Sequence, residues 1–440
     1  NHQLSFSGGS EKINYYVSGN YFNQEGVVIN SDFERFSFLS NIDVQATDKL
    51  KLGFNAFANV GNRDGIQSQA SSGGSGGGDV ISTAYRFAPD TPVQDANGIN
   101  TTNPVGDQFD NPFAIATESV DETKTDDYRA NFYADYQIIS GLSFKTTFGY
   151  GTTNSTRGRF LPSTLIGQAS NQGGIASIES LKRKDILSEN YLTYKKEIGK
   201  GNLTVLLGYS YQKTRTETFG AAAQNFISNS LSYFNLGAGS DIQTPFSELV
   251  EREIISQFGR INYEYDDRYL FTFTARRDGS SNFSRNNKYS FFPSGAIGWR
   301  ISNEKFLQDN KTISNLKLRA SYGLTGNPAI SPYQSLASFQ RIYSNVGDQP
   351  VNAVVPEQLA NPDLKWETSY QTNIGLDIGF LENRIALTLD YYNIDTEDLI
   401  LGDSSAPEYI GFANLTSLRN IGEINNKGFE ITLNTQNIVS

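Results

Sequence analysis

In the stretch LSFKTTFGY, residues 142–150, apolar and polar side chains alternate along the chain. One side carries Leu142, Phe144, Thr146, Phe148 and Tyr150, and the other carries Ser143, Lys145, Thr147 and Gly149. A repeat of two residues is the pattern of a β-strand whose two faces meet different surroundings. The stretch therefore predicts a strand with one apolar face and one polar face.

The same alternation recurs in many segments on both sides of this stretch. Clear examples lie at 269–276, 316–322, 385–391 and 429–434. We count about fifteen segments of roughly ten residues, which is the length that a tilted strand needs to cross a bilayer. Helical periodicity is almost absent, so the sequence predicts an all-β chain.

The connections between these segments are short and long in turn. Short links fall at 10–11, 47–48, 140–141, 199–201, 266–267 and 381–383, and long links fall at 61–127, 154–182, 215–251, 324–367 and 396–426. In a transmembrane β-barrel the periplasmic turns are short and the extracellular loops are long, and every second connection emerges on the same side. The connections therefore predict a transmembrane antiparallel β-barrel.

Two links depart from this pattern. The predicted extracellular link at 278–287 is short, and the predicted periplasmic link at 302–314 is long. We expect a helical turn at 304–307 within the long periplasmic link.

The number of segments bears on how much of a barrel the chain contains. Bacterial single-chain barrels have an even number of strands, and barrels of about 22 strands have a plugged lumen. About fifteen strands are then an incomplete set, and no segment resembles a compact plug domain. We expect residues 1–440 to be part of a barrel of about 22 strands, with the plug before Asn1 and the final strands after Ser440.

Composition supports a folded chain that crosses a membrane with strands. Hydrophobic residues make up 38% of the chain, but aromatic residues reach 12%, which is too many for a disordered protein. A membrane-spanning helix needs about 18 consecutive apolar residues, and the chain has no such run, so any span must be a closed barrel. Residues 1–10 lack the features of a signal peptide, so either the chain is cytosolic or its beginning is missing. Methionine is absent, which again suggests a fragment. The net charge of −11 argues against nucleic acid as a partner.

The sequence offers little for covalent chemistry. Cysteine is absent, which excludes disulfides, thiolate zinc sites and cysteine nucleophiles, and His2 is the only histidine. Gly73, Ser75 and Gly77 match the nucleophile-elbow pattern, but that pattern needs an entering strand, a leaving helix and a histidine base. We interpret residues 71–79 as a surface loop and predict no catalytic residue, no metal-binding residue, no cofactor and no enzymatic activity.

Acidic residues before one predicted strand raise the alternative of a bound ion. Asp121, Glu122, Asp126 and Asp127 could ligate calcium through carboxylate oxygens, although they do not have EF-hand spacing. The simpler interpretation is a solvated loop that leads into a strand. Structural calcium in the loops stays open as an alternative.

Aromatic and charged residues near segment ends have two interpretations each. The aromatic group comprises Tyr15, Tyr16, Tyr21, Phe22, Tyr263, Tyr265, Tyr391 and Tyr392. Such rings anchor at the membrane interface when they lie on the apolar face, and they can stack on sugars when they lie on the polar face. Arg276, Arg277, Asp278 and Arg319 fit a charged lumen, with a specific ligand contact as the alternative.

Several stretches resemble outer-membrane proteins of the SusC/RagA family of Bacteroidetes, and together they extend over nearly the whole chain. They are NHQLSFSGGSEK (1–12), RYLFTFTARRDGSS (268–281), FPSGAIGWRI (292–301), EKFL (304–307), LKLRASYGLTGN (316–327), NPDLKWE (361–367) and IGEINNKGF (421–429). The resemblance implies a plugged, TonB-dependent barrel in the outer membrane of a Gram-negative cell. It further implies energisation by the TonB–ExbB–ExbD system, a SusD-like lipoprotein lid, and import of glycans or peptides.

The chain lacks a recognisable TonB box, and the resemblance transfers no ligand-binding residue to a position in this sequence. Three other functions stay open at this point. The barrel could be a scaffold or adhesion protein whose loops, such as 61–127, bind another protein, or it could be a passive pore without a plug. A soluble β-rich adhesin would instead need the apolar faces to be packed inside.

Overall fold

The computed structural model describes residues 1–66, 79–104, 109–165, 172–307, 310–403 and 417–437. The chain forms two compact units. The first unit comprises Asn1–Tyr133, Phe148–Ile186 and Thr214–Glu251. The second comprises Ala134–Thr147, Leu187–Lys213 and Arg252–Ser440. Among the described residues, no helix is long and apolar enough to cross a membrane.

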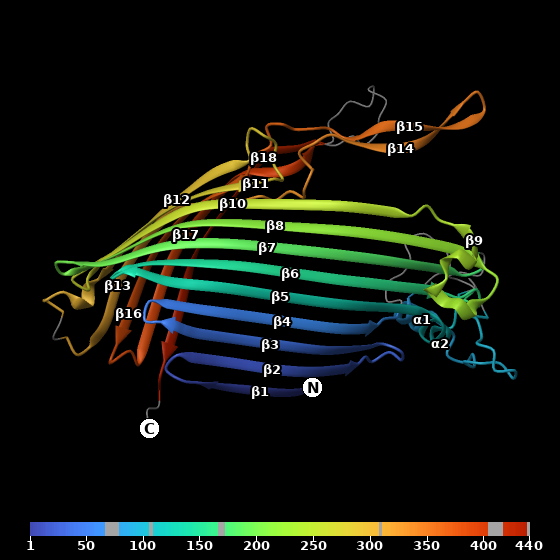
Figure 1. Cartoon of the computed structure of the whole chain (residues 1–440), viewed down its shortest axis with the longest axis horizontal. Coiled ribbons are helices and arrows are strands. Elements are labelled where there is room, and N and C mark those ends of the chain that lie inside the picture. The colour runs from blue at the N-terminus through green and yellow to red at the C-terminus, as the bar shows by residue number, and fades with distance from the viewer. Residues whose placement is uncertain (67–78, 105–108, 166–171, 308–309, 404–416, 438–440) are drawn as a thin grey trace. The chain divides into compact units, whose positions relative to one another are not determined.

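Nearly all regular structure in the chain is β-strand, and sequential strands are neighbours in one antiparallel sheet (Figure 1). The order is β1-β2-β3-β4-β5-β6-β7-β8-β10-β11-β12-β13-β16-β17-β18, with β9 paired to β8. Their bounds are β1 His2–Gly9, β2 Ile13–Glu25, β3 Asp32–Thr47, β4 Leu50–Asp64, β5 Val120–Ile139, β6 Leu142–Leu161, β7 Ile175–Ile198, β8 Gly201–Phe226, β9 Gly239–Ile242, β10 Phe246–Tyr265, β11 Tyr269–Ser280, β12 Tyr289–Arg300, β13 Ile313–Asn327, β16 Glu367–Phe380, β17 Ile385–Asp403 and β18 Ser417–Thr435. A separate two-stranded sheet contains β14 (Ser338–Val346) and β15 (Gln349–Gln358).

The alternation of apolar and polar residues correctly located the strands, but it underestimated their length. Most strands exceed ten residues, and β8 is the longest with 26. Its residues Lys213–Thr218 are polar on both faces, because charged residues alternate there with threonines. Backbone pairing continues into this polar region since it does not depend on an apolar face. The long links are therefore shorter than predicted.

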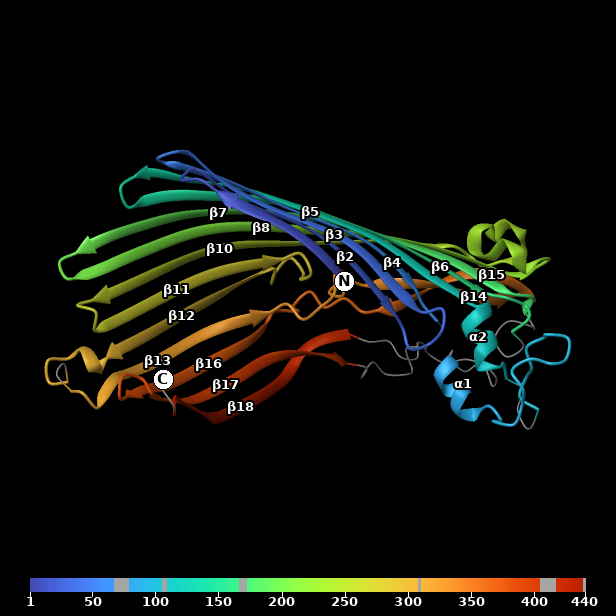
Figure 2. The same ribbon diagram turned by 90° about the horizontal axis from the view of Figure 1, so that it is seen from below.

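The short links are tight turns, as predicted, and lie at one end of the strands (Figure 2). Asp266 and Asp267 both have positive φ, 51° and 49°, in the turn between β10 and β11. Two successive positive φ values are typical of a type I′ turn, whose twist matches the flanking strands, and the Arg268 N–H closes this turn by donating to the Tyr265 carbonyl at 3.0 Å. The long link between β12 and β13 contains a 3-10 helix, Ile301–Asn303, followed by a turn in which the Leu307 N–H donates to the Glu304 carbonyl at 2.9 Å. The predicted helical turn is thus present and begins three residues earlier.

Two short helices, which the sequence analysis did not predict, lie in the link between β4 and β5. Helix α1 (Val80–Arg86) is capped by the Asp79 carboxylate, which accepts from the backbone N–H groups of Ile81 and Ser82 at 2.9 and 2.8 Å. Helix α2 (Pro112–Glu118) is capped by Asn111, and proline stands at its first position. Both caps are standard helix-start signals, but seven residues are too few to display helical periodicity.

Buried apolar residues concentrate near the long links rather than along the strands. In the first unit, Val80, Ala114, Ile115, Ala116 and Leu165 form one core, and Phe160, Ala176, Ala223, Phe226 and Tyr233 form another. In the second unit, Phe283, Phe292, Ile330, Leu364 and Trp366 form a third. By contrast, the apolar strand residues Phe273, Ile297 and Tyr322 are 52%, 59% and 54% exposed. A soluble adhesin needs such residues packed inside, so their exposure argues against that alternative.

Candidate functional site: the polar face of the strands

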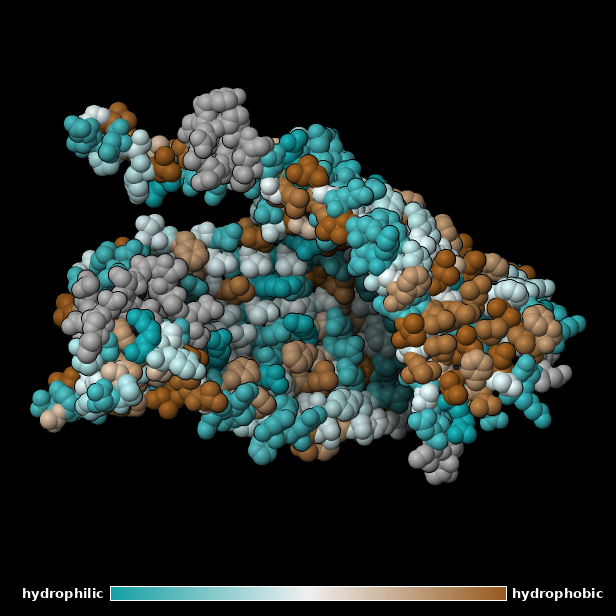
Figure 3. All heavy atoms as spheres, turned by 180° about the vertical axis from the view of Figure 1, so that it is seen from behind, coloured by the Kyte–Doolittle hydropathy of each residue, from teal (hydrophilic) through white to brown (hydrophobic). Residues whose placement is uncertain are grey.

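Strand register assigns each side chain to one of two faces. Directly opposite residues of antiparallel neighbours point to the same side. One row therefore joins Phe271 of β11, Ile297 of β12 and Ala320 of β13, and the next row on the other face joins Thr272, Ala296 and Ser321. The first face is apolar and is called the outer face here, and the second is polar and is called the inner face. Figure 3 shows apolar residues gathered over one side of the second unit.

On the inner face of the second unit, Arg319 links three neighbouring strands. Its guanidinium donates to both carboxylate oxygens of Asp377 on β16, at 2.9 and 3.1 Å, and to Asp390 on β17 at 3.2 Å. Thr388 also donates to Asp377, at 3.3 Å. The bidentate geometry is the strong form of the arginine–carboxylate pair. The predicted position of Arg319 on the polar face is correct.

A glycine makes the Arg319 network possible. Gly375 of β16 stands directly opposite Arg319 and directly opposite Asp390. A Cβ atom at this position would lie 2.5 Å from Asp390 Oδ1 and 2.6 Å from Arg319 Cζ. Because glycine has no side chain, the guanidinium can cross β16 and reach β17.

Arg276 forms a second inner-face site with an aromatic component. Its Nε donates to Asp278 at 2.7 Å, and its Nη2 donates to Ser256 at 2.8 Å. The guanidinium carbon lies 5.2 Å from the centre of the Phe258 ring, within the range of a cation–π contact. Tyr191 packs against Phe258 with ring centres 5.9 Å apart. The result is a surface with rings and a paired charge, in which Ser256 itself is buried.

Arg277, which the sequence grouped with Arg276 and Asp278, lies on the other face. It pairs directly with Phe291 of β12, and its guanidinium carbon lies 4.3 Å from the centre of the Tyr289 ring. Adjacent strand residues point to opposite sides, so the three charges cannot act as one site. The interpretation as a charged lumen therefore applies to Arg276, Asp278 and Arg319 alone.

The acidic residues at 121–127 lie inside β5 rather than in a loop before it. Asp121 accepts from Arg157 Nε and Nη2 at 2.7 and 2.5 Å. Glu122 accepts from the buried Tyr233 hydroxyl at 2.6 Å, and burial raises the pKa of that hydroxyl. Asp127 pairs with Arg129 at 3.0 Å.

These contacts change the interpretation of the acidic residues. The expected solvated loop was wrong because backbone pairing already begins at Val120. Neighbouring residues of a strand point to opposite faces, so Asp121 and Glu122 cannot converge on one ion. Within the described ranges, no group of three or more His, Cys, Asp or Glu side chains is arranged to hold a metal.

Register also sorts the aromatic residues whose face the sequence left open. In the second unit, Tyr263, Tyr265 and Tyr391 lie on the outer face and Tyr392 lies on the inner face. In the first unit, Tyr15 and Tyr21 share the apolar face of Leu4 and Phe6, and Tyr16 and Phe22 lie on the opposite, polar face. The tyrosines on the apolar faces are on the side where interface anchors lie. The aromatic residues on the polar faces are available to ligands.

The remaining sequence candidates contribute no site. His2 lies in β1, and its ring packs against Tyr21 with centres 6.3 Å apart. Ser75, Gly73 and Gly77 lie outside the described residues.

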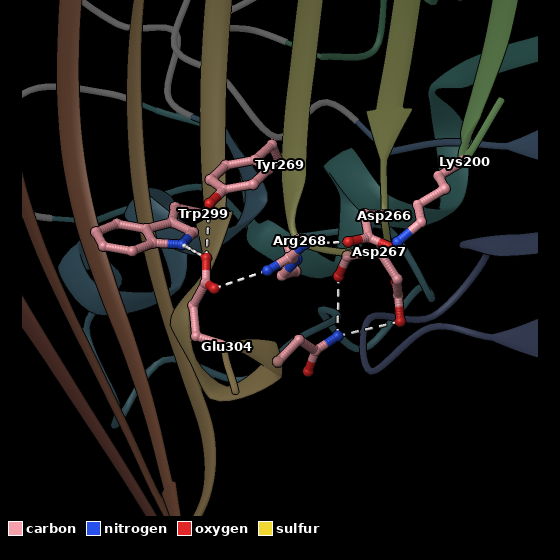
Figure 4. Close-up of polar contacts among 8 residues, drawn as sticks. Lys200, Asp266, Asp267, Arg268, Tyr269, Trp299 and Glu304 are labelled. Atoms are coloured by element: carbon pink, nitrogen blue, oxygen red, sulfur yellow. Dashed lines mark hydrogen bonds and ion pairs between the residues drawn. The ribbon is translucent and has the colours of Figure 1, made fainter. Parts of the chain in front are cut away.

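A polar network, which the sequence analysis did not anticipate, lies at the short-turn end of the second unit (Figure 4). The Glu304 carboxylate accepts from the Tyr269 hydroxyl at 2.7 Å, from Trp299 Nε1 at 3.0 Å and from Arg268 Nη1 at 2.8 Å. Arg268 also contacts Asp266, which lies 3.6 Å from Lys200 Nζ. The donors from Tyr269, Trp299 and Arg268 lower the pKa of Glu304 below its ordinary value. The carboxylate is therefore ionised at neutral pH.

An apolar groove lies among the long links of the first unit. Its volume is about 440 Å³, and it is lined by Val27, Val28, Ile29, Val80, Ile81, Ala84, Tyr85, Pro112, Phe113 and Ala116. Tyr85 is 88% exposed and Ile81 is 50% exposed. Exposed apolar groups of this kind mark interaction surfaces.

Comparisons with known proteins agree with this architecture. A family model described as TonB dependent receptor-like, beta-barrel matches residues 53–437. TonB-dependent receptor P3 of Formosa agariphila is 54% identical over 440 residues, which are 100% of this chain and 44% of that protein. TonB-dependent receptor SusC of Bacteroides thetaiotaomicron is 30% identical over 466 residues, which cover 100% of this chain and 45% of that protein.

A solved structure, the RagAB peptide transporter, aligns with a TM-score of 0.83 and 26% identity over 98% of this chain and 48% of that chain. The chain spans less than half the length of these relatives.

Proposed function

Because the chain belongs to the TonB-dependent receptor family and is of the SusC/RagA type, we propose that it forms the wall of an outer-membrane importer for oligosaccharides or peptides. The protein lies in the outer membrane, and its relatives are receptors and transporters rather than enzymes. We propose that no bond of the substrate is broken. The observation that carries the proposal is the inner face, where polar and aromatic groups line strands whose other face is apolar.

The charges of the inner face support a ligand of low net charge. Arg319 is matched by Asp377 and Asp390, and Arg276 is matched by Asp278. These ions keep hydrogen-bonding capacity but attract an anionic ligand weakly, because Asp278 balances Arg276 and the two carboxylates beside Arg319 outnumber it. Neutral oligosaccharides and mixed peptides fit this surface better than anionic polymers do.

Aromatic rings on the same face support binding of sugar rings or apolar peptide side chains. Phe258 and Tyr191 form one such surface, and Tyr392 is on the inner face of β17. The RagAB proteins are described as a peptide transporter, which keeps peptides among the candidate substrates.

Import against a gradient requires energy and a closed resting state. In this proposal the TonB–ExbB–ExbD system pulls on a plug that the rest of the full-length protein supplies. Structural calcium in the loops remains a minor proposal, for which the carboxylates at 121–127 offer no support.

A SusD-like lipoprotein lid is the proposed extracellular partner. The apolar groove around Tyr85 and Ile81 supports this part, because it lies among the long links and exposes large apolar groups. A protein lid that covers this groove would bury those groups.

The decisive experiment measures uptake by whole cells. Fluorescein-labelled maltoheptaose and a fluorescein-labelled decapeptide library are offered to cells with the gene, without it, and with the gene but without TonB. The proposal predicts that uptake of at least one probe requires both the gene and TonB. Uptake that survives loss of TonB would indicate a passive pore.

Matched variants locate the ligand on the inner face. Phe258→Ala removes a ring from the inner face, and Phe273→Ala removes one from the outer face. We expect Phe258→Ala to reduce uptake about tenfold, the loss expected when about 1.4 kcal/mol of ring contact is removed. Phe273→Ala should leave uptake per folded receptor unchanged.

A scaffold or adhesion role is the second candidate, and the ribbon of β14 and β15 favours it. Phe339, Tyr343 and Val354 of this ribbon are 65%, 70% and 71% exposed. An isolated two-stranded ribbon is marginally stable in water, so a protein contact would stabilise it. Deletion of 338–358 that abolishes a stable complex but preserves uptake would assign the ribbon to assembly rather than to transport.

A further inference from the structure

A groove lies on the outer face of the second unit, where strands β10 to β16 meet the membrane. Its volume is about 540 Å³. Its lining includes Ile261, Tyr263, Phe271, Phe273, Gly295, Ile297, Ala320, Tyr322 and Ile374. The floor is low because Gly295 and Ala320 have small side chains and stand between larger neighbours. The groove faces away from the polar side, so it does not belong to the proposed import site.

The depth of the groove in the membrane follows from a row of aromatic rings. Tyr265 and Tyr269 lie on the outer face with ring centres 6.5 Å apart, and Tyr269 and Trp299 follow at 6.4 Å. Such rows mark the level of the lipid headgroups. The two rows that line the groove lie two and four residues farther along the strands, or about 7 and 13 Å. The groove therefore lies at the level of acyl chains in the periplasmic leaflet.

The link between β12 and β13 is held against the aromatic row. Glu304 accepts hydrogen bonds from Tyr269 and Trp299, so the link lies on the outer side of the turns. The next two residues, Lys305 and Phe306, are exposed, and Phe306 is 72% exposed. A cation beside an exposed ring at headgroup level is the combination found in interfacial anchors.

We propose that the groove binds one acyl chain of a glycerophospholipid from the periplasmic leaflet, with Lys305 and Phe306 at its headgroup. The apolar lining matches the chain, and Lys305 matches the phosphate. Glu304 is a positioning residue, because it fixes the link to the aromatic row. The proposal does not depend on the import activity, since it concerns the opposite face of the strands.

Groove-filling substitutions test the acyl-chain site without disturbing the fold. Among the residues that the structure describes, a Cβ atom at Gly295 would meet only the Thr272 carbonyl oxygen, at 3.9 Å, so Gly295→Leu introduces no clash at that atom. Ala320→Leu fills the same groove from β13. Ala275→Leu is the matched control, because Ala275 also lies on the outer face of β11 but does not line the groove.

The experiment uses the full-length receptor in nanodiscs that contain phosphatidylethanolamine with a diazirine on one acyl chain. After illumination, mass spectrometry measures labelling at Phe271, Ile297 and Tyr322, relative to Tyr391 of β17 and Phe429 of β18, which lie on the outer face in the register row of Ile297 but do not line the groove. We expect at least a threefold excess at the groove, its loss in Gly295→Leu and Ala320→Leu, and its survival in Ala275→Leu. Equal labelling of both places, or an excess that survives filling of the groove, would overturn the proposal.

The headgroup contact has its own comparison. Lys305→Glu should reduce the labelling excess severalfold, whereas Lys49→Glu, in the turn between β3 and β4, should not. An excess that is unchanged by Lys305→Glu would refute the assigned role of that lysine. Heat-modified migration in electrophoresis reports whether each variant is folded.

Discussion

Replacement of Gly375 by alanine should disrupt the Arg319 network more than its small size suggests. The new Cβ atom would lie 2.5 Å from Asp390 Oδ1 and 2.6 Å from Arg319 Nη2. These distances are too short for nonbonded atoms, so the guanidinium must move. It would then lose at least one of its bonds to Asp377 and Asp390, which measure 2.9–3.2 Å.

Two opposing effects set the magnitude. A hydrogen bond to a charged group contributes about 1.5–3 kcal/mol, but the Arg319 side chain is 32% exposed, so solvent reduces this to about 1–2 kcal/mol. Alanine in place of glycine also restricts the unfolded chain, which stabilises the folded state by about 0.4–1 kcal/mol. We expect a net destabilisation of about 1 kcal/mol. Gly402→Ala on β17 is the control, because a Cβ there meets no atom of the described residues within 4 Å and only the stabilising effect is expected.

The assay is urea unfolding of the full-length receptor in detergent micelles. A double-mutant cycle with Arg319→Gln isolates the coupling between Gly375 and Arg319. We predict that Gly375→Ala destabilises the wild type but has little effect in the Arg319→Gln background. If Gly375→Ala and Gly402→Ala have the same effect, or if the cycle shows no coupling, the argument for the glycine is wrong.

Three further predictions concern the turns and links. Asn111→Ala removes the N-terminal cap of α2 and should raise the amide exchange rate in 112–118 by an amount that corresponds to about 1 kcal/mol. Exchange in 80–86 should stay slow, and an unchanged rate in 112–118 would mean that the cap is unimportant. Tyr233→Phe removes the donor to Glu122 and should lower the free energy of unfolding by about 1 kcal/mol in the same micelle assay, and a neutral result would refute the contribution of this bond. Hydrogen-bond donors around Glu304, and Arg268 beside Asp266, lower the pKa of both carboxyls, so these contacts stabilise the link at neutral pH and are lost as pH falls below about 4. Amide exchange of 301–307, corrected for intrinsic rate, should therefore rise at low pH, and Glu304→Gln should raise it already at pH 7. A pH-independent exchange rate in the wild type would contradict the assignment.

The sequence was sufficient for the architecture and the family, because both depend on patterns that repeat along the chain. Alternation at 316–322 placed the residues of β13 on the faces where register puts them, and in β6 the exposed rings of Phe144, Phe148 and Tyr150 alternate as expected. The SusC/RagA resemblance is confirmed by relatives and by a solved structure. The expected strand count of about fifteen agrees with the fifteen strands of the continuous order. Completion by a plug and further strands stays a prediction.

Contacts between distant residues could not be predicted in the same way. Arg319 meets Asp377 and Asp390 across separations of 58 and 71 residues, which only the strand register brings together. The opposite orientation of Arg276 and Arg277 could have been predicted, because a period of two already places neighbouring strand residues on opposite faces. Helices α1 and α2 escaped prediction because their caps are local signals that a search for long periodic segments overlooks.

The claim that one face meets lipid and the other meets the lumen is tested most directly by a nitroxide scan along β13. Each position from 316 to 323 is replaced in turn by a single cysteine, in a full-length receptor that has no other cysteine, and the cysteine is labelled with a nitroxide. Electron paramagnetic resonance of the receptor in nanodiscs then compares how often each label collides with oxygen and with a water-soluble nickel complex. The account predicts that Leu316, Leu318, Ala320 and Tyr322 favour oxygen while Lys317, Arg319, Ser321 and Gly323 favour nickel, with a period of two. Equal accessibility along the strand, or a period near 3.6, would contradict it.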